Sequence, residues 1–419
     1  MKVLYFHQHF STPGGATGTR SYEFARKLID RGHEVTMVCG SSTVGKTGLT
    51  GKSVKGIREG VVDGIRVIEI SLPYSNYDSL FTRSIIFLRY SLKSVKIALC
   101  KDYDIIFATS TPLTAAIPGI ITKLLKPWKK FVFEVRDLWP ELPKAMGVVT
   151  NPVILLGMSI LEKSAYITMD GGIGLSPGIK MGMEKRTPKN KPVIMIPNGC
   201  DVALFKPSDD ATKAEKIKLR AKDKRVKPGS FVAVYTGAHG MANGLDAVLN
   251  AARVMKNRKI THIKFLFIGD GKLKPQLLEK THRESLSNCI FFDPIPKKDL
   301  IGLMGEVDLG LMILNNIPAF YYGTSPNKFF DYIAMGLPVF INYPGWLAEM
   351  ITENCLGKTV LPDDPEAFAD TLYNMSMNRH HMKKMGKNAR LFAEKKFNRS
   401  QLANIFVDYL ERFNNDSIL

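Results

Sequence analysis

The stretch VAVYTGAHGMANG, residues 232–244, decides the fold expected for this chain. It is an apolar strand that runs directly into a glycine-rich turn. A second such transition stands near the start, where an apolar strand at 2–7 runs into the turn Pro13-Gly14-Gly15 and then into a helix that includes Arg20. Glycine lets a backbone approach a ligand closely, and the free N–H groups of a helix start attract anions. The two turns predict two nucleotide-fold domains that face one ligand across a cleft.

The alternation of strands and helices along the chain agrees with this division. In the first half, strands are predicted at 2–7, 34–39, 66–70, 104–109, 130–135, 171–175 and 192–196, with helices between most of them, for example at 19–31. The second half has strands at 231–236, 264–268, 289–292, 309–313 and 338–342, and its tail from Pro365 is helical. The pattern predicts an α/β fold with a parallel sheet in each half.

A length of 419 residues is too great for one ordinary core. The expected domains are residues 1–205 and 230–397, joined by a charged linker at 206–229. Residues 40–60 are rich in Gly, Ser, Thr and Lys without apolar periodicity, so we expect a mobile surface loop there.

The composition narrows the function classes. Five scattered cysteines without a CxxC pair favour neither a disulfide framework nor a zinc site, and neither a signal peptide nor a membrane span is predicted. The net charge is +19, of which +12 lies in the first 200 residues. Basic and apolar residues are interleaved at 80–101 and around Trp128, among Lys123, Lys126, Lys129 and Lys130. This surface is either a solvated basic face or a docking face for an anionic membrane; no nucleic-acid-binding module is present.

Short motifs follow the predicted strands of the second half. They are FLFIGDGK at 265–272, DPIP at 293–296 and SPNKFFDYIAMGLPV at 325–339. Each motif alone is a weak signal, but their order and spacing together are strong.

With this series the chain resembles the family 4 glycosyltransferases, retaining enzymes of the GT-B fold, over essentially its whole length. The resemblance includes the turn at Gly14-Gly15 and the segment IPNGCDVALFKP, residues 196–207. The segment EVRDLWPE, residues 134–141, is similar to the subgroup that builds bacterial O-antigens and capsules, and within it to the N-acetyl-L-fucosaminyltransferases. The family fold implies two Rossmann-like domains facing each other across a cleft. The nucleotide sugar would bind the C-terminal domain and the acceptor the N-terminal one, onto which the last helix, about 398–419, is expected to pack.

The resemblance also implies the substrates and the location. The donor would be a UDP-sugar, with an N-acetylated amino sugar in this subgroup, and no metal or other cofactor is expected. The acceptor would be a polyprenyl-diphosphate-linked sugar, so the protein would be cytoplasmic and peripheral at the anionic inner face of the bacterial plasma membrane. Asp102-Tyr103-Asp104 has the D-x-D form of a metal motif, but it directly precedes a strand and is interpreted as a turn.

The chain departs from the family at its phosphate site. The turn at 236–244 lacks the usual Arg and Lys, and of the usual two glutamates the second aligns with Asp331 whereas the first falls on Gly323. A leaving diphosphate still needs positive charge, and Lys328 is the first candidate to supply it; the alternative is a solvated lysine at a helix start. The catalytic candidates are Lys328, Arg136, Asp137 and Glu134, the last three of which could instead form a buried network that holds a loop.

The remaining expected site residues fall into two sets. The nucleotide-sugar-binding set is Gly237, His239, Gly240, Asn243, Gly269, Lys272, Pro294, Ile295, Pro296, Ser325, Asn327 and Asp331, and the acceptor-side set is Gly14, Gly15 and Arg20. Within the first set, His239 would donate to the phosphates, residues 294–296 would contact the base, and Asp331 would accept from the ribose hydroxyls. For His239, Lys272, Asp331 and the Gly14-Gly15 turn, purely structural roles remain open.

Two other function classes share this architecture. A nucleotide-sugar epimerase also has two Rossmann-like domains, but it would need acid and base groups for elimination and would leave the basic, apolar surface unexplained. A non-catalytic nucleotide-binding protein would explain the missing cations.

Overall fold

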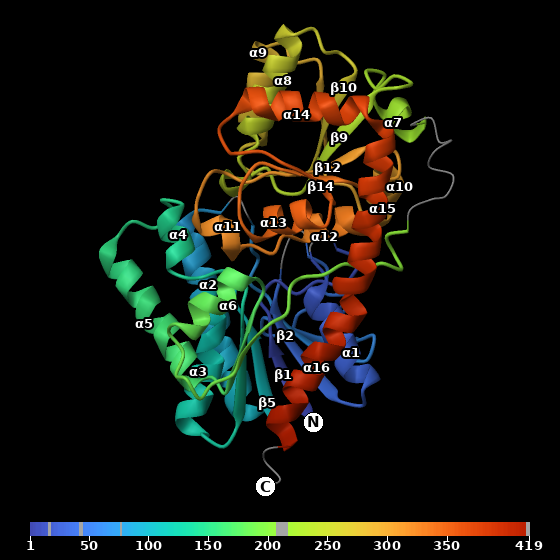
Figure 1. The fold of residues 1–419 in the computed structure, drawn as a ribbon. Coiled ribbons are helices and arrows are strands. Elements are labelled where there is room, and N and C mark those ends of the chain that lie inside the picture. Colours follow the sequence, from blue (N-terminus) through green and yellow to red (C-terminus); the bar gives the residue numbers. More distant parts are fainter. Residues whose placement is uncertain (16–17, 42–44, 76–77, 207–216, 416–419) are drawn as a thin grey trace. The chain divides into compact units, whose positions relative to one another are not determined.

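The computed structural model describes residues 1–15, 18–41, 45–75, 78–206 and 217–415, and the chain folds into two compact units (Figure 1). Unit 1 comprises Met1–Asn198, Tyr322–Ser325 and Arg399–Leu419, and unit 2 comprises Gly199–Tyr321 and Pro326–Asn398. The division thus falls after Asn198, whereas the sequence placed it at residue 205. Of the predicted linker, residues 207–216 lie outside the described residues, and helix α7 (Ile217–Lys222) follows them.

Unit 1 is built on an eight-stranded sheet with the order β3-β4-β2-β1-β5-β6-β7-β8. Its strands are parallel, except that β3 runs antiparallel to β4. The strands are β1 (Lys2–Phe6), β2 (Glu34–Gly40), β3 (Ile57–Val62), β4 (Ile65–Ile70), β5 (Ile105–Thr109), β6 (Lys130–Val135), β7 (Gly171–Gly174) and β8 (Val193–Met195).

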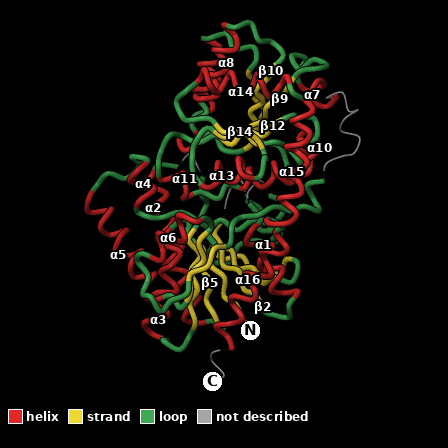
Figure 2. The backbone as a smooth tube through the Cα atoms, in the orientation of Figure 1, coloured by secondary structure: helices red, strands yellow, loops and turns green. Residues whose placement is uncertain are grey.

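Helices cover both faces of this sheet, which is why apolar runs such as β5 are buried throughout. One face packs against α1 (Arg20–Asp30) and α16 (Arg399–Asn415), and the ring of Phe406 in α16 stacks on that of Phe24 at 4.5 Å. The other face packs against α2 (Leu80–Cys100), α3 (Ile117–Leu125), α5 (Pro152–Thr168) and α6 (Pro177–Glu184). The short helices η1 (Leu113–Ala116) and α4 (Glu141–Ala145) complete the unit. Figure 2 shows the strands in yellow with the red helices around them.

The structure differs from the loop predicted at 40–60. Its last residues belong to β3, which forms a hairpin with β4 through Asp63 and Gly64. Both turn residues have positive φ, 50° and 81°, and Asp-Gly is a pair that tolerates this conformation. The alternation of the short β3 was too weak to recognise, although the Asp-Gly pair was a usable signal.

Unit 2 is built on a six-stranded parallel sheet with the order β11-β10-β9-β12-β13-β14. Its strands are β9 (Phe231–Thr236), β10 (Ile263–Ile268), β11 (Cys289–Phe292), β12 (Leu309–Met312), β13 (Val339–Ile341) and the unpredicted edge strand β14 (Gly357–Thr359). The main core joins the sheet to α8 (Asp246–Asn257), α9 (Lys274–Arg283), α14 (Pro365–Met377) and α15 (Arg379–Lys396). Helix α12 (Asn327–Ala334) packs against β12 and β13. The other helices are η3 (Met241–Asn243), α10 (Lys297–Met304), α11 (Ala319–Gly323) and α13 (Trp346–Glu353).

Each sheet reverses its direction of strand addition beside its first strand. In unit 1, β2 and β4 lie on one side of β1 and β5 to β8 on the other; in unit 2, β10 and β11 lie on one side of β9 and β12 to β14 on the other. In sheets of this kind, ligands bind outside the carboxyl ends of the strands at such a point. The loops that follow β1 and β5 in unit 1, and β9 and β12 in unit 2, are therefore the places where a site is expected.

Candidate functional site

Two glycine turns lie side by side at the carboxyl ends of β9 and β10. The N–H of Gly237 donates to the last carbonyl of β10, and that of His239 donates to the Asp270 carbonyl, each at 2.9 Å, so the strand pairing continues into the turns. Gly269 and Gly271 have φ of 150° and 155°. A Cβ on Gly271 would lie 2.7 Å from the carbonyl oxygen of His239, and one on Gly269 would collide with the Gly237 carbonyl. The two backbones can approach this closely only because these positions are glycine.

Lys328 brings an ammonium group to the turn after β9. Its Nζ lies 3.3 Å from Oδ1 of Asn243 and 3.8 Å from the centroid of the Tyr235 ring. A Cβ on Gly237 would be 3.3 Å from the same Nζ. Burial lowers the pKa of Lys328 to about 7, and no carboxylate of the described residues opposes that effect. The turn that lacks Arg and Lys in the sequence therefore receives a cation from α12.

Tyr332 fixes α12 against the end of β9. Its hydroxyl accepts the Thr236 N–H at 2.9 Å, and Gly310 in β12 makes room for its ring. Residues four apart on a helix lie on the same face, so the contact that holds Tyr332 also positions Lys328. Asn327 and Asp331 are related in the same way and lie together on a neighbouring stripe of this helix.

His239 does not present its ring at the surface of the turn. The side chain is fully buried, with ring centroids of Tyr235, Phe267 and Phe291 within 6.0 to 6.4 Å. Burial, together with the charges of nearby lysines, lowers its pKa to about 4, so it is neutral. The sequence predicted that the His239 side chain donates to phosphate. In the structure the ring instead points inward, toward the rings of Tyr235, Phe267 and Phe291.

The cation expected at Lys272 is exposed, whereas Lys274, which the sequence analysis missed, is buried. Nζ of Lys274 donates to the Gly269 carbonyl at 3.0 Å and pairs with Asp293 at 2.6 Å. It therefore ties the turn after β10 to the loop after β11. No sequence signal distinguishes two lysines in a Gly-Lys-Leu-Lys segment, because which of them points inward depends on the packing of α9.

The loop at 294–296 follows β11 and leads into α10, whose first turn bonds back to the Pro296 carbonyl. Pro294 and Pro296 are exposed and Ile295 is half-buried. Because β11 neighbours β10 and β10 neighbours β9, this loop and both glycine turns follow consecutive strands at one edge of the sheet. Gly240 and Asn243 belong to the same edge.

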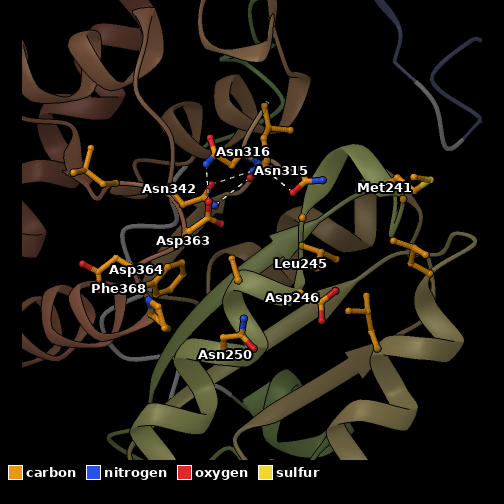
Figure 3. Close-up of a pocket in the computed structure, with 18 residues that line it drawn as sticks. Met241, Leu245, Asp246, Asn250, Asn315, Asn316, Asn342, Asp363, Asp364 and Phe368 are labelled. Atoms are coloured by element: carbon orange, nitrogen blue, oxygen red, sulfur yellow. Dashed lines mark hydrogen bonds between the residues drawn. The ribbon is translucent and has the colours of Figure 1, made fainter. Parts of the chain in front are cut away.

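A pocket of about 480 Å³ also adjoins the turn at Gly240 and Gly244 (Figure 3). Its amides are largely occupied: Asn342 bonds both backbone groups of Leu314, at 3.0 and 3.1 Å. Its described lining includes three aspartates and no lysine or arginine. The pocket is therefore unsuited to a diphosphate.

Ser325, an expected donor-site residue, is assigned to unit 1. Its Oγ accepts the Asn198 N–H at 3.1 Å, and the Asn198 amide donates to the Ser325 carbonyl. This arrangement fixes the backbone just before α12.

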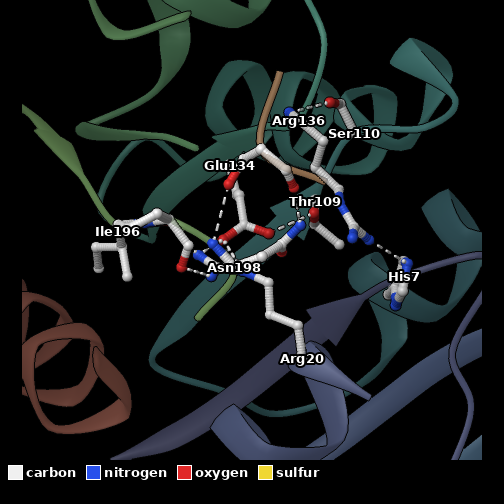
Figure 4. A network of polar contacts seen from close by, with 10 residues as sticks. His7, Arg20, Thr109, Ser110, Glu134, Arg136, Ile196 and Asn198 are labelled. Atoms are coloured by element: carbon white, nitrogen blue, oxygen red, sulfur yellow. Dashed lines mark hydrogen bonds and ion pairs between the residues drawn. The ribbon is translucent and has the colours of Figure 1, made fainter. Parts of the chain in front are cut away.

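Glu134 lies in a buried ion pair at the end of β6 (Figure 4). Nη2 and Nε of Arg20 lie 2.7 and 3.0 Å from its carboxylate, and Thr109 donates to it at 2.7 Å. Arg20 also donates to the carbonyls of Ile196 and Pro197, and neither member of the pair is more than 1% exposed. This geometry corresponds to the structural alternative: the pair joins β6, α1 and the segment after β8, and both of its side chains are buried.

Arg136 and Asp137 follow Glu134 but lie at the carboxyl edge of the sheet. Figure 4 shows the Arg136 side chain directed to His7, with Nη1 3.4 Å from Nε2. Burial and the Arg136 charge lower the pKa of His7, so the ring is neutral and can accept. Asp137 accepts from Thr111 at 3.3 Å; burial raises its pKa and the Arg136 charge opposes this.

The turn at Gly14 and Gly15 is closed by the Gly15 N–H, which donates to the Thr12 carbonyl at 3.0 Å. A Cβ on Gly14 would meet only the Thr12 hydroxyl, at 3.6 Å, so space alone does not require glycine there. Residues 16–17 of the same turn lie outside the described residues.

Within the described part of the chain, no cluster of three or more His, Cys, Asp or Glu side chains could hold a metal ion. Asp102 pairs with Lys2 at 2.7 Å and Asp104 accepts the Lys2 N–H at 2.6 Å, so both serve the turn that leads into β5.

Residues 230–378, most of unit 2, match the family model described as glycosyl transferases group 1. No curated protein matches the chain. Among solved structures, sucrose-phosphate synthase from Thermosynechococcus elongatus has a TM-score of 0.76 at 15% identity, covering 99% of this chain and 100% of its own. HepE of Anabaena, solved in complex with UDP, has a TM-score of 0.69 at 17% sequence identity. The match covers 98% of this chain and 100% of HepE.

WaaG, described as a glycosyltransferase involved in lipopolysaccharide biosynthesis, has a TM-score of 0.63 at 14% identity, covering 97% of this chain and 99% of its own. Likeness at such identities shows the fold, and it confirms the predicted class, α/β with two parallel-sheet Rossmann-like domains. The subtype suggested by residues 134–141 is not among these matches. Residues 230–378 thus match the group 1 glycosyl transferases, within a chain whose fold is that of the GT-B glycosyltransferases.

Proposed function

We propose that this protein is a retaining, metal-independent glycosyltransferase that moves an N-acetylated amino sugar, such as N-acetyl-L-fucosamine, from a UDP-sugar to a lipid-linked saccharide of an O-antigen or capsule. The family match in unit 2 and the UDP in the HepE structure support the donor. The role of WaaG in lipopolysaccharide biosynthesis supports the acceptor class. The observation that carries the proposal is the ammonium group of Lys328 beside the glycine turn after β9.

The chemistry follows from that placement. The bond between the anomeric carbon and the β-phosphate oxygen breaks, and the oxygen gains negative charge. Lys328 stabilises this charge, an effect that grows toward the transition state. The acceptor hydroxyl attacks the same face of the sugar and passes its proton to the leaving phosphate. No protein base is then required, which suits a chain whose Glu134 is sequestered by Arg20.

The surface of unit 1 supports docking on an anionic bilayer. No described helix is long and apolar enough to cross a membrane. Yet Phe81 at the start of α2 is 75% exposed, and in the first turns of α5 Val153 and Leu156 are 74% and 61% exposed. Both helices begin after strands, so their first turns lie toward the carboxyl edge of the sheet. Exposed Arg89 and Lys93 follow on α2. Apolar side chains that enter the headgroup region beside basic ones are typical of interfacial helices.

The lysines around Trp128 contribute less than their sequence suggests. Nζ of Lys126 donates to the Leu99 carbonyl at 2.9 Å, and the Lys129 ammonium bonds the Tyr103 carbonyl. These groups cap backbone carbonyls, so substituting them would test stability as well as membrane binding. Better variants are Val153→Ser with Leu156→Ser, compared with Met377→Ser on the exposed surface of unit 2. We expect only the α5 variant to lose binding to anionic vesicles; unchanged binding would remove α5 from the docking face.

The decisive experiment incubates the protein with a panel of UDP-sugars and EDTA, with and without a polyprenyl-diphosphate-linked N-acetylglucosamine. Transfer predicts free UDP and a new lipid-linked product whose anomeric configuration matches the donor. An epimerised UDP-sugar without acceptor would indicate the epimerase instead. UDP binding without turnover on any donor would indicate a non-catalytic protein.

A further inference from the structure

Two arginines at the carboxyl edge of the unit 1 sheet have no role in the mechanism above. Arg136 follows β6, and Arg83 lies in the first turn of α2. Neither forms an ion pair with a carboxylate among the described residues. The Nε of Arg83 is buried and has no hydrogen-bond partner there. Both side chains are half-buried, and guanidinium groups that form no ion pair favour an anion beside them.

The two arginines flank one group of rings. The ring centroids of His9 and Tyr74 are 4.7 Å apart. The Tyr74 ring stacks on that of Phe87, with centroids 5.8 Å apart and an interplanar angle of 24°. The Arg83 guanidinium lies 5.6 Å from the Tyr74 ring centroid. We call His9, Tyr74 and Phe87 the aromatic shelf.

The histidines beside the arginines add no charge. Burial and the charges of both Arg83 and Arg136 lower the pKa of His9 to about 4. Arg83 lies beside the Tyr74 ring and Arg136 lies beside His7, two residues before His9, so an anion in this region would be attracted by both guanidinium groups. Asp137 offsets part of the Arg136 charge, which opposes the rise of its pKa, but the hydrogen bond that its side chain accepts comes from Thr111.

We propose that Arg83 and Arg136 bind the phosphate-ester anion of the acceptor, and that the aromatic shelf packs against the groups next to it. This inference rests on the proposed function. It assigns Arg136, one of the catalytic candidates from the sequence, to binding of the acceptor. Paired guanidinium groups suit a diphosphate because each can make two parallel N–H···O bonds.

The neighbouring surface fits a lipid-linked diphosphate. Leu80 and Phe81, in the same first turn of α2 as Arg83, are 52% and 75% exposed. An isoprenoid chain could thus lie against these residues while Arg83 holds its diphosphate. An anion without a hydrocarbon chain would not bury these apolar side chains.

The test measures binding of three probes by calorimetry: farnesyl diphosphate, inorganic pyrophosphate and UDP. Arg83→Gln and Arg136→Gln should each raise the Kd for farnesyl diphosphate at least tenfold. Each should leave the Kd for UDP within twofold of the wild type. Arg66→Gln, an exposed arginine near the start of β4 in the same unit, is the matched control and should change neither. Arg83→Lys should recover part of the affinity. Thermal unfolding of each variant identifies any that fails to fold.

Each outcome decides the matter. An equal loss of UDP binding in Arg136→Gln, or unchanged farnesyl diphosphate binding in Arg83→Gln, overturns the proposal. Pyrophosphate bound as tightly as farnesyl diphosphate would overturn its lipid part and leave a site for free diphosphate. Failure of the proposed function is separate: UDP would not bind the wild type, or no UDP-sugar would be turned over, whatever the arginine variants do.

Discussion

Replacing Lys328 by alanine should remove the cation at the glycine turn. The ammonium group approaches Gly237 and Asn243, and within the described part of the chain no carboxylate competes for it. Loss of one charge-assisted donor aimed at developing charge costs about 2–4 kcal/mol, or about 10²–10³ in rate. Because the charge builds up as the bond breaks, the loss should fall mainly on kcat.

The assay is steady-state release of UDP with saturating acceptor, for the wild type and two variants. Lys272→Ala is the matched control, since it removes an exposed lysine from the neighbouring turn and should keep kcat within about twofold. A folded Lys328→Ala protein whose kcat stays within about threefold of the wild type would refute the assignment. Equal losses in both variants would indicate a diffuse charge effect.

The pH dependence gives a second, independent test. In the protein without ligand the pKa of Lys328 is about 7. A bound diphosphate stabilises the charged form of the side chain and raises that pKa. Affinity for a UDP-sugar should therefore be greatest below the free pKa and fall as pH rises from about 7 toward the bound pKa, by up to about tenfold per unit. Lys328→Ala should lose this dependence. A flat wild-type profile would contradict the buried cation.

The remaining predictions concern the ribose contact, the metal and the buried ion pair. Asp331→Ala should raise the KM for the UDP-sugar more than it lowers kcat, because a ribose contact is present in ground and transition states alike; a collapsed kcat at constant KM would contradict it. UDP should bind with the same Kd with and without EDTA in calorimetry, and loss of binding on chelation would show that a metal takes part. Glu134→Ala should destabilise unit 1 by about 3 kcal/mol, because Arg20 would be left buried without its carboxylate; an unchanged denaturation midpoint with lost activity would instead give Glu134 a direct role in the reaction.

The strands and the glycine turns could be predicted from the sequence because their signals are local. Apolar runs of strand length, each ending in turn residues, fixed β5, β6, β9 and β10 to within a residue, and burial under helices on both faces explains those runs. Gly269 and Gly271 were recognisable because a backbone that approaches another so closely tolerates no Cβ. The short strands β3 and β14 were missed because they lie at sheet edges, where few residues need to be buried.

The roles of individual polar side chains were decided only by the tertiary structure. Lys328 and Asn243 are 85 positions apart, and Arg20 and Glu134 are 114 apart, so no local pattern relates them. Parallel sheets bring such residues together because each crossover helix returns the chain to the same edge. The same packing turned the His239 ring into the core and buried Lys274 while leaving Lys272 in solvent. The sequence thus singled out Lys328 among several candidate cations, and the contact of α12 with the end of β9 determined that its ammonium group lies at the glycine turn.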